Sequence, residues 1–487
     1  MKKIMAFSMI FILIVTTFLY SCRDDNINTP SSSFGDNTQN DTETKSDILD
    51  NLPNMNYGGY KFRVYVRDLE YFRLDFAAEE QTGDILNDAV YSRNLAVEER
   101  FNVKIEPLFY AFDWDARLDA LTYIMAGEDA FDIFLAHAHV AAQYISRDVL
   151  VDWIQDLPYV NLDAKWWSQD LVKESSMFGK LFCAMGDIGY TMIGSTVCLF
   201  FNKDLFVNFD IEYPYDEVIN GTWTMEKFTT LVKNGKNDLD GDGIITVDAD
   251  MFGMGTNVYT YPIAMLYCGG DRVISKDADG DPVLTLYTER TVNIYNTLQD
   301  LIDSESVSFV GYSVDNNPNN VDTFKAGRAL FTSPLMNGIV SYRAMEAEIG
   351  IVPVPKYDET ISKYYTFVEA GANMICVPIT AEDLERTSIL LESLCVEGYR
   401  TITPAYYEKA LKTKYSRDSE SEDMLDYITD GIVYDYGYLN AEITGYLATC
   451  GSVLIQNQKT IPTFTNLYMT NERSVMQSIE NLILKYK

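Results

Sequence analysis

The stretch GDILNDAVYSRNLAVEERFNVKI, residues 83–105, decides the fold, because the segments on either side of it complete a repeating pattern. Its apolar residues recur at helical spacing and predict a helix whose buried face carries Leu86, Val90, Val97 and Phe101. Strands are predicted at 60–66 (YKFRVYV), 103–110 (VKIEPLFY) and 131–136 (FDIFLA), and a second helix at 114–127. Strand–helix–strand alternation implies a parallel sheet with right-handed crossovers, and therefore an α/β fold.

The carboxyl ends of the predicted parallel strands are the expected place for a ligand. This rule points to Arg67 and Asp68 after the first strand, and to His137 and His139 after the third. The chain continues with two apolar strands around a Gly-Asp turn in 180–202, a helix over 222–235, strands near 327–334 and 349–358, and a mainly helical C-terminal portion. With 487 residues, two lobes are expected rather than one core.

Charge and composition exclude several classes of function. The net charge of -34 repels nucleic acid phosphates and anionic lipid heads, so no nucleic acid partner is expected. The chain contains only two histidines, which leaves little material for imidazole-based metal catalysis or Ser-His triads. The composition fits a soluble protein that works outside the cell.

The N-terminus predicts export. Lys2 and Lys3 precede an apolar run over 4–20, shorter than the ~20 residues of a spanning helix. Residues 1–21 resemble a bacterial lipoprotein signal peptide, which implies that Cys22 carries the lipid; an uncleaved anchor is the alternative. Residues 22–50 are polar and predict a flexible tether. We therefore expect a protein anchored at the extracellular face of the cell membrane.

The other six cysteines are scattered through apolar runs without C-x-x-C spacing: Cys183, Cys198, Cys268, Cys376, Cys395 and Cys450. A zinc site is therefore not expected. Export permits disulfides, but buried free thiols are the expected state in a chain of this size.

The segment NDLDGDGIITVDADMFG, residues 237–253, resembles a calcium loop. Asp238, Asp240 and Asp242 occupy the first, third and fifth positions of an EF-hand loop, Gly243 the sixth, and Ile244 would offer its carbonyl. Ala249 occupies the twelfth position, so Asp248 or Asp250 must complete the shell. No exit helix is predicted, which favours a structural calcium over a sensor; a solvated acidic turn is the alternative. KDADGDPVLTL, residues 276–286, is predicted to be a hairpin turn.

Several stretches in order are similar to the extracellular solute-binding proteins (family 1, carbohydrate type) of bacterial ABC importers. They are GDILNDAVYSRNLAVEERFNVKI, WWSQDLVKESSMFGKLFCAMGDI, FNKDLF, GTWTMEKF, KAGRALF, IGIVPVPKYDE with KYYTF, and AYYEKALKTKYSRDSESEDMLDYI. The resemblance implies a two-lobe periplasmic-binding-protein-like (Venus flytrap) fold with a central mixed sheet in each lobe. It implies a monomeric receptor, without catalysis, that binds a carbohydrate between its lobes and delivers it to the importer's membrane subunits.

The same resemblance suggests where the lobes divide. Residues 51–188 and 331–395 would form lobe 1, and residues 189–330 and 396–487 lobe 2, with crossings near 186–190 and near Phe331. Together with the strand-end rule it suggests ligand-binding residues: Asp68, Trp114, His137, His139, Asp187, Tyr190, Tyr259, Tyr261, Asn337 and Glu369. The alternative for each of these residues is an ordinary position in a loop, a turn or the core, without contact to a ligand.

Three other tryptophans are expected to be structural. Trp166 and Trp167 predict a packing corner, and Trp223 a core contact beside a helix cap. Two other functions stay open from the residues alone. A glycoside hydrolase needs two carboxylates about 5–10 Å apart, which a chain with 72 acidic residues could always supply. A calcium-dependent adhesion module would be favoured by repeated calcium motifs, but only one good loop is present.

Overall fold

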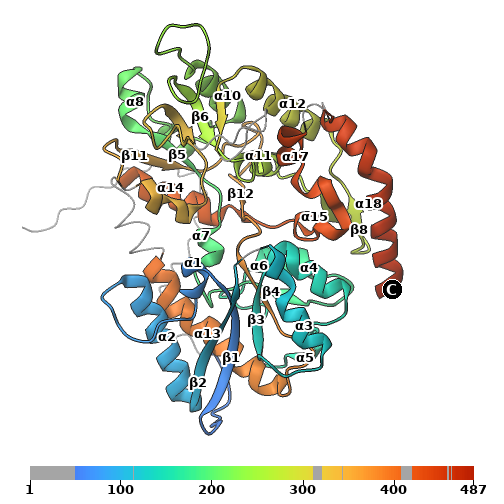
Figure 1. The fold of residues 1–487 in the computed structure, drawn as a ribbon. Helices are drawn as coiled ribbons and strands as arrows, with labels where there is room; N and C mark the ends of the chain where they lie inside the picture. Colours follow the sequence, from blue (N-terminus) through green and yellow to red (C-terminus); the bar gives the residue numbers. More distant parts are fainter. Residues whose placement is uncertain are drawn as a thin grey trace, which may run out of the picture. The chain divides into compact units, whose positions relative to one another are not determined.

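The computed structural model describes residues 50–112, 114–310, 321–342, 344–406, 419–457, 460–461 and 463–487. Two five-stranded sheets organise these residues (Figure 1). The first sheet has the order β2-β1-β3-β13-β4 and the second β11-β5-β10-β6-β9. We call each sheet, with the helices packed beside it, a lobe.

Both sheets are mixed, as predicted. The first contains β1 (Tyr60–Asp68), β2 (Val103–Ala111), β3 (Ile133–His137), β4 (Cys183–Ala184) and β13 (Asn373–Cys376). The parallel strands β2, β1 and β3 are the ones predicted from the repeating pattern, and β13 runs antiparallel to β3 and β4. The second contains β5 (Leu199–Asn202), β6 (Phe252–Thr256), β9 (Val307–Phe309), β10 (Ala329–Thr332) and β11 (Ile349–Val352).

Two strand pairs lie outside these sheets. They are β7 (Ile274–Lys276) with β8 (Pro282–Leu284), and β12 (Thr366–Phe367) with β14 (Ile432–Val433). The first pair is antiparallel, and its turn is the hairpin predicted at 276–286.

The helices of the N-terminal half are α1 (Glu70–Arg73), α2 (Ile85–Phe101), η2 (Asp115–Leu118), α3 (Asp119–Met125), α4 (Ala138–Ser146), α5 (Trp153–Asp156), α6 (Gln169–Ser175), α7 (Thr191–Gly194), α8 (Lys203–Asn208), α9 (Tyr215–Ile219) and α10 (Met225–Asn234). Those that follow are α11 (Tyr261–Ala264), η3 (Met265–Gly269), α12 (Glu289–Asp303), η4 (Met336–Tyr342), α13 (Leu384–Pro404), α14 (Ser419–Asp430), α15 (Tyr436–Leu439), α16 (Ala441–Thr444), η6 (Gly445–Thr449), α17 (Cys450–Gln456) and α18 (Phe464–Tyr486). Among the described helices, none combines the length and apolar character needed to span a bilayer.

Helix α2 forms as its sequence predicts. Asp84 caps its start by accepting hydrogen bonds from the N–H groups of Leu86 and Asn87. Asn102 ends it in the left-handed conformation, with φ 50°. Val90, Val97 and Phe101 are buried, and α2 packs against α13 beside the first sheet (Figure 1).

The predicted lobe boundaries need a correction. β10 and β11 pair with β5, so the second lobe continues past Phe331 and the chain returns to the first sheet only after β12. Helix α13 belongs to the first lobe as far as Pro404. The crossings from β4 to β5 and from β12 to β13 lie side by side, because Val197 N–H donates to the Phe367 carbonyl (2.9 Å) and Glu369 N–H to the Ser195 carbonyl (2.9 Å).

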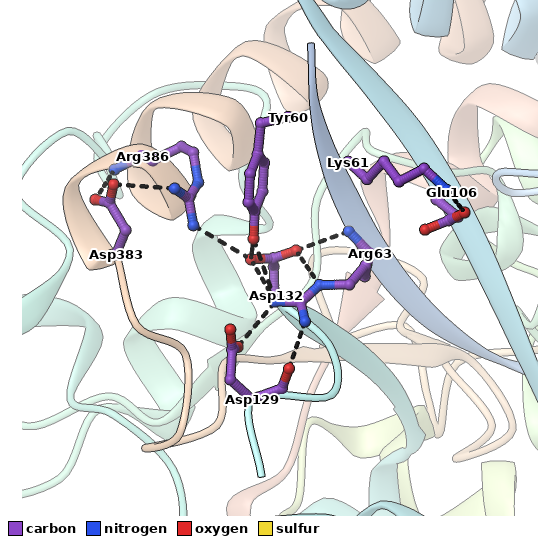
Figure 2. A network of polar contacts seen from close by, with 8 residues as sticks. All are labelled: Tyr60, Lys61, Arg63, Glu106, Asp129, Asp132, Asp383 and Arg386. Carbon is purple, nitrogen blue, oxygen red and sulfur yellow. Dashed lines mark hydrogen bonds and ion pairs between the residues drawn. The ribbon is translucent and has the colours of Figure 1, made fainter. Parts of the chain in front are cut away.

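A buried carboxylate ties the amino ends of β1 and β3 to α13. Asp132, just before β3, accepts hydrogen bonds from the Tyr60 hydroxyl (2.6 Å) and from Arg63 N–H (2.7 Å) (Figure 2). The Arg386 guanidinium of α13 lies 3.7 Å from the Asp132 carboxylate and 3.5 Å from the Tyr60 ring centre. Because this network lies at the amino ends of the strands, it supports the sheet from the end opposite to the predicted ligand site.

The predicted packing corner is confirmed, and it surrounds a second buried carboxylate. The indole N–H groups of Trp166 and Trp167 donate to Glu392 of α13 at 2.8 and 2.9 Å, and Asn161 N–H donates at 3.1 Å. Trp223 is likewise fully buried in the core, as expected. All six described cysteines are buried free thiols, as expected.

Candidate functional site

Arg67 lies near the carboxyl end of β1, where the strand-end rule places a ligand. It is 5% exposed. Its Nη2 donates to the Gly371 carbonyl and to Asn373 Oδ1, both at 2.6 Å, and its guanidinium lies 3.6 Å from the Phe72 ring centre. Among the described residues, no partner reaches its Nε and no carboxylate forms an ion pair with it. A buried cation therefore retains an unused donor.

Glu369 brings a carboxyl group close to this cation from the crossing between β12 and β13. Burial raises the pKa of Glu369, whereas the Gly371 N–H bonded to it at 2.7 Å and the charge of Arg67 lower it. Burial lowers the pKa of Arg67, and Glu369 and Asp75 are among the groups that raise it. The site thus holds a buried cation and, nearby, the half-buried carboxyl group of Glu369, and among the described residues the two form no direct ion pair.

His137 ends β3 and pairs with Asn373 of β13, and His139 follows in the first turn of α4. The Nδ1 atom of His137 and the Nε2 atom of His139 are buried and have no partner among the described residues. Burial holds the pKa of His137 well below its usual value and lowers that of His139 to about 4, although a hydrogen bond with the Tyr438 backbone opposes the latter. Both rings are therefore neutral at pH 7, and each has one donor and one acceptor nitrogen.

A row of rings connects these histidines to Trp114 on one side and to Tyr438 of α15 on the other. Trp114 meets His137 edge-on with ring centres 5.6 Å apart, His137 and His139 are 5.4 Å apart, and His139 meets Tyr438 of α15 at 4.5 Å. Trp114 is 57% exposed, and Arg117 lies 4.9 Å from its ring centre. The Tyr438 hydroxyl accepts a hydrogen bond from Ala370 N–H (3.0 Å) of the crossing beside Glu369.

The structure therefore brings together four of the predicted ligand-binding residues: Trp114, His137, His139 and Glu369. Arg67 was indicated by the strand-end rule. Asp75 was not predicted; its buried carboxylate accepts from Tyr190 N–H, the Thr191 hydroxyl and the Asn373 amide at 3.0, 2.8 and 2.7 Å. Its signal in the sequence is a single charged residue among apolar neighbours in LDFAA.

The other predicted ligand residues have different surroundings. Asp68 is exposed and paired with Arg73, and the Asn337 side chain hydrogen-bonds with the Tyr71 hydroxyl. Asp187 is buried and accepts from the Thr403 hydroxyl of α13 at 2.7 Å, which ties the first crossing to that helix.

The three predicted tyrosines lie in three different environments. Tyr190 is 3% exposed, and its ring stacks on Tyr406 with centres 5.2 Å apart. Tyr259 and Tyr261 do not share a side, because α11 begins at Tyr261. Tyr259 is 56% exposed, whereas Tyr261 is buried against Phe228 in the core, which does not fit a solute contact.

The predicted calcium loop gathers three carboxylates. Oxygens of Asp238, Asp240 and Asp250 lie within 4.8 Å of one another, so Asp250 rather than Asp248 closes the group. Asp242 is not part of this group, and its carboxylate accepts from Ile244 N–H at 2.7 Å. The Asp242 N–H bond lowers the pKa of Asp240, but burial and the neighbouring carboxylates give a net rise. The three carboxylates repel one another, and hard oxygen donors at this spacing fit a calcium ion.

A broad groove of about 1080 Å³ lies on the second lobe, away from these residues. It is bordered by Tyr213, Tyr215 and several carboxylates, among them Glu212, Asp216, Glu226 and Glu359. None of its lining side chains is among the buried polar atoms that lack a partner. The cluster around Arg67 and His137 is therefore the better candidate for specific recognition.

No protein-family model matches this chain, and no curated protein matches it. Among solved structures, the ABC substrate-binding protein Lmo0181 from Listeria monocytogenes in complex with cycloalternan has a TM-score of 0.53 and 15% identity, over 87% of this chain and 98% of that one. A cyclo/maltodextrin-binding protein complexed with maltotetraose has a TM-score of 0.55 and 14% identity, over 87% of this chain and 97% of that one. The chain therefore has the two-lobe α/β fold of these binding proteins.

Proposed function

We propose that the chain is a non-catalytic extracellular receptor that binds a carbohydrate, in particular an oligosaccharide, between its lobes and delivers it to an ABC importer. The observation that carries this proposal is the cluster of buried, unpartnered polar atoms on Arg67, His137 and His139 beside the exposed indole of Trp114. Buried polar groups without partners are uncommon and costly, so a bound solute is the natural partner.

The chemistry of the cluster suits sugar hydroxyls. Each hydroxyl donates and accepts, and two neutral imidazoles together with Arg67 and Glu369 supply both kinds of partner. The Trp114 indole offers a flat apolar face for the C–H side of a sugar ring. The two solved structures with this fold are complexes with cycloalternan and with maltotetraose, which supports the same class of ligand.

Further exposed rings favour an oligosaccharide over a single sugar. Phe112 and Phe109 are 51% and 41% exposed, and they precede Trp114 at the carboxyl end of β2. The ring centres of Phe112 and Phe72 are 5.6 Å apart, and the Arg67 guanidinium lies over the Phe72 ring. A chain of several sugar units could cover these rings in addition to the central cluster.

A ligand screen tests the proposal. Oligosaccharides that bind only the native state should raise the melting temperature in proportion to the logarithm of their concentration. The recovered glycan is then analysed for cleavage, because a shortened glycan would overturn the receptor reading in favour of a hydrolase. An effect confined to peptides or amino acids would overturn the carbohydrate assignment.

We also propose a structural calcium ion held by Asp238, Asp240 and Asp250. The loop is already closed by the Asn237–Met251 backbone pair, and Arg328 binds the carbonyls of Val247 and Asp250 at 2.7 and 2.8 Å. The ion would offset two of the three negative charges and fix the loop, without a part in solute binding. Chelation with EGTA should lower the melting temperature, and an unchanged melting temperature would contradict the proposal.

Finally, we propose that Cys22 carries a lipid that anchors the receptor at the cell surface. Cys22 lies outside the described residues, so the support is the sequence around it. Labelled palmitate should be incorporated into the natural protein and not into a Cys22→Ser variant; equal labelling of both would refute the anchor.

A further inference from the structure

Two of the buried cysteines occupy partner positions on neighbouring strands. Cys183 of β4 and Cys376 of β13 are directly opposite each other in an antiparallel pair. Opposite Cα atoms in such a pair are about 4.5–5.5 Å apart, within the roughly 4.4–6.8 Å that a disulfide spans. The two thiols also interact through a side-chain hydrogen bond. No other pair of described cysteines shares a strand register.

We propose that Cys183 and Cys376 form a reversible disulfide that fastens β4 to β13 in the exported protein. The proposal rests on the export that the N-terminal sequence predicts, because disulfides persist outside the cell. The neighbouring positions already hold the two strands in register, since Ala184 pairs with Ile375. The bond therefore needs side-chain rotation rather than movement of the sheet.

The surroundings provide a route for exchange. β4 is the edge strand of the first sheet, has only two residues and, among the described strands, pairs with β13 alone, so opening it breaks fewer strand hydrogen bonds than opening a central strand. Cys183 also borders a small cavity lined by Ala138 and Ala142 of α4 and by Tyr436 of α15, which gives its side chain room to turn. While the sheet is closed, burial raises the pKa of the Cys376 thiol, so exchange is expected during folding or local opening.

The reaction is thiol–disulfide exchange with a small-molecule disulfide. One cysteine thiolate attacks a sulfur of the reagent, forming a mixed disulfide and releasing one reagent thiol. The second cysteine thiolate then attacks the protein sulfur of the mixed disulfide and releases the other reagent thiol. Two protein thiols are oxidised, one reagent disulfide is reduced to two thiols, and the two protons leave with the released thiolates.

The disulfide would join the two crossing segments at the points where they meet the first sheet. The first crossing starts directly after β4, and the second ends directly before β13. A disulfide here closes a loop that contains the whole second sheet, and long loops are the ones in which a cross-link restricts the unfolded chain most. Oxidation is therefore expected to raise the melting temperature without covering the cluster around Arg67.

The test counts and maps thiols in the full chain. The protein is equilibrated with oxidised and reduced glutathione, alkylated under denaturing conditions and digested. Cys183 and Cys376 should be protected and recovered as one linked peptide pair, and reduction with dithiothreitol should free both. Alkylation of both Cys183 and Cys376, a stable glutathione adduct on either one, or linkage of either to a different cysteine would overturn the proposal.

Variants separate the bond from general effects of oxidation. Cys183→Ser should leave Cys376 alkylated and abolish the rise in melting temperature on oxidation. Cys450→Ser, which changes a buried thiol on α17 outside both sheets, should keep the linked pair and the rise. If Cys183→Ser fails to fold, the peptide map of the unmodified chain decides alone.

Discussion

Replacing Glu392 by Gln should make the stability of the protein respond differently to pH. Glu392 is fully buried, and the indoles of Trp166 and Trp167 and the N–H of Asn161 donate to its two oxygens. Burial raises its pKa to about 7 from 4.5, and the hydrogen bonds from Trp167, Asn161 and Trp166 oppose the rise. Glu392→Gln keeps the shape of the side chain and removes the titration.

The magnitude follows from the pKa difference. Because the folded-state pKa is raised, the stabilisation is complete below pH 4.5 and is lost as pH rises to about 7. A rise of about 2.5 units corresponds to a loss of about 3 kcal/mol across this window. The Gln side chain has one accepting oxygen, so one indole N–H would lose its partner, at a cost of roughly 1–3 kcal/mol.

We therefore expect Glu392→Gln to be less stable than the natural protein at pH 5 by roughly 1–3 kcal/mol. The difference should shrink or reverse by pH 8, as the natural protein loses about 3 kcal/mol that the variant does not. Urea unfolding followed by tryptophan fluorescence measures both. Glu385→Gln, on the exposed side of the same helix, removes an equal charge and is the matched control. A difference that stays constant from pH 5 to 8 would refute the reasoning.

Three other perturbations test separate parts of the structure. Asp132→Ala removes the partner of Tyr60 and Arg63 and should lower the free energy of unfolding by about 3–5 kcal/mol while leaving ligand affinity unchanged; weaker binding by folded protein would contradict this. Because the folded-state pKa of His139 is lowered to about 4, the natural protein should lose about 3 kcal/mol of unfolding free energy as pH falls from 6.5 to 4, and His139→Gln should not. The same fall in unfolding free energy in both proteins would contradict this. Asp240→Asn should weaken calcium binding measured by titration, whereas Asp248→Asn, outside the carboxylate group, should not; equal effects would refute the assigned ligands.

The first lobe could be predicted because its signals are local. Apolar spacing over residues 83–101 and the caps at Asp84 and Asn102 are written in consecutive residues, and the structure confirms the helix they predict. The pairing partners of β10 and β11 are not local. Their short apolar runs would suit either sheet, so the boundary near Phe331 was wrong even though the strands themselves were expected.

The residues of the candidate site also fall into those that local sequence signals could predict and those that they could not. The positions of His137 and Trp114 at the carboxyl edge of the sheet could be predicted, because His137 ends β3 and Trp114 comes shortly after β2. Tyr259 and Tyr261 looked equivalent because they alternate, but the helix that begins at Tyr261 turns the second ring into the core. Asp75 could not be selected, because its three donors come from the first crossing and from β13, far away in the sequence.

Isothermal titration of the protein with an intact oligosaccharide found in the screen tests the central claim most directly. Trp114→Ala is compared with Phe209→Ala, which removes an exposed ring from the second lobe, next to α8. The account predicts saturable binding of about one glycan per chain, weakened at least about tenfold (~1.4 kcal/mol) by Trp114→Ala and unchanged by Phe209→Ala. Equal affinities in all three proteins would contradict it.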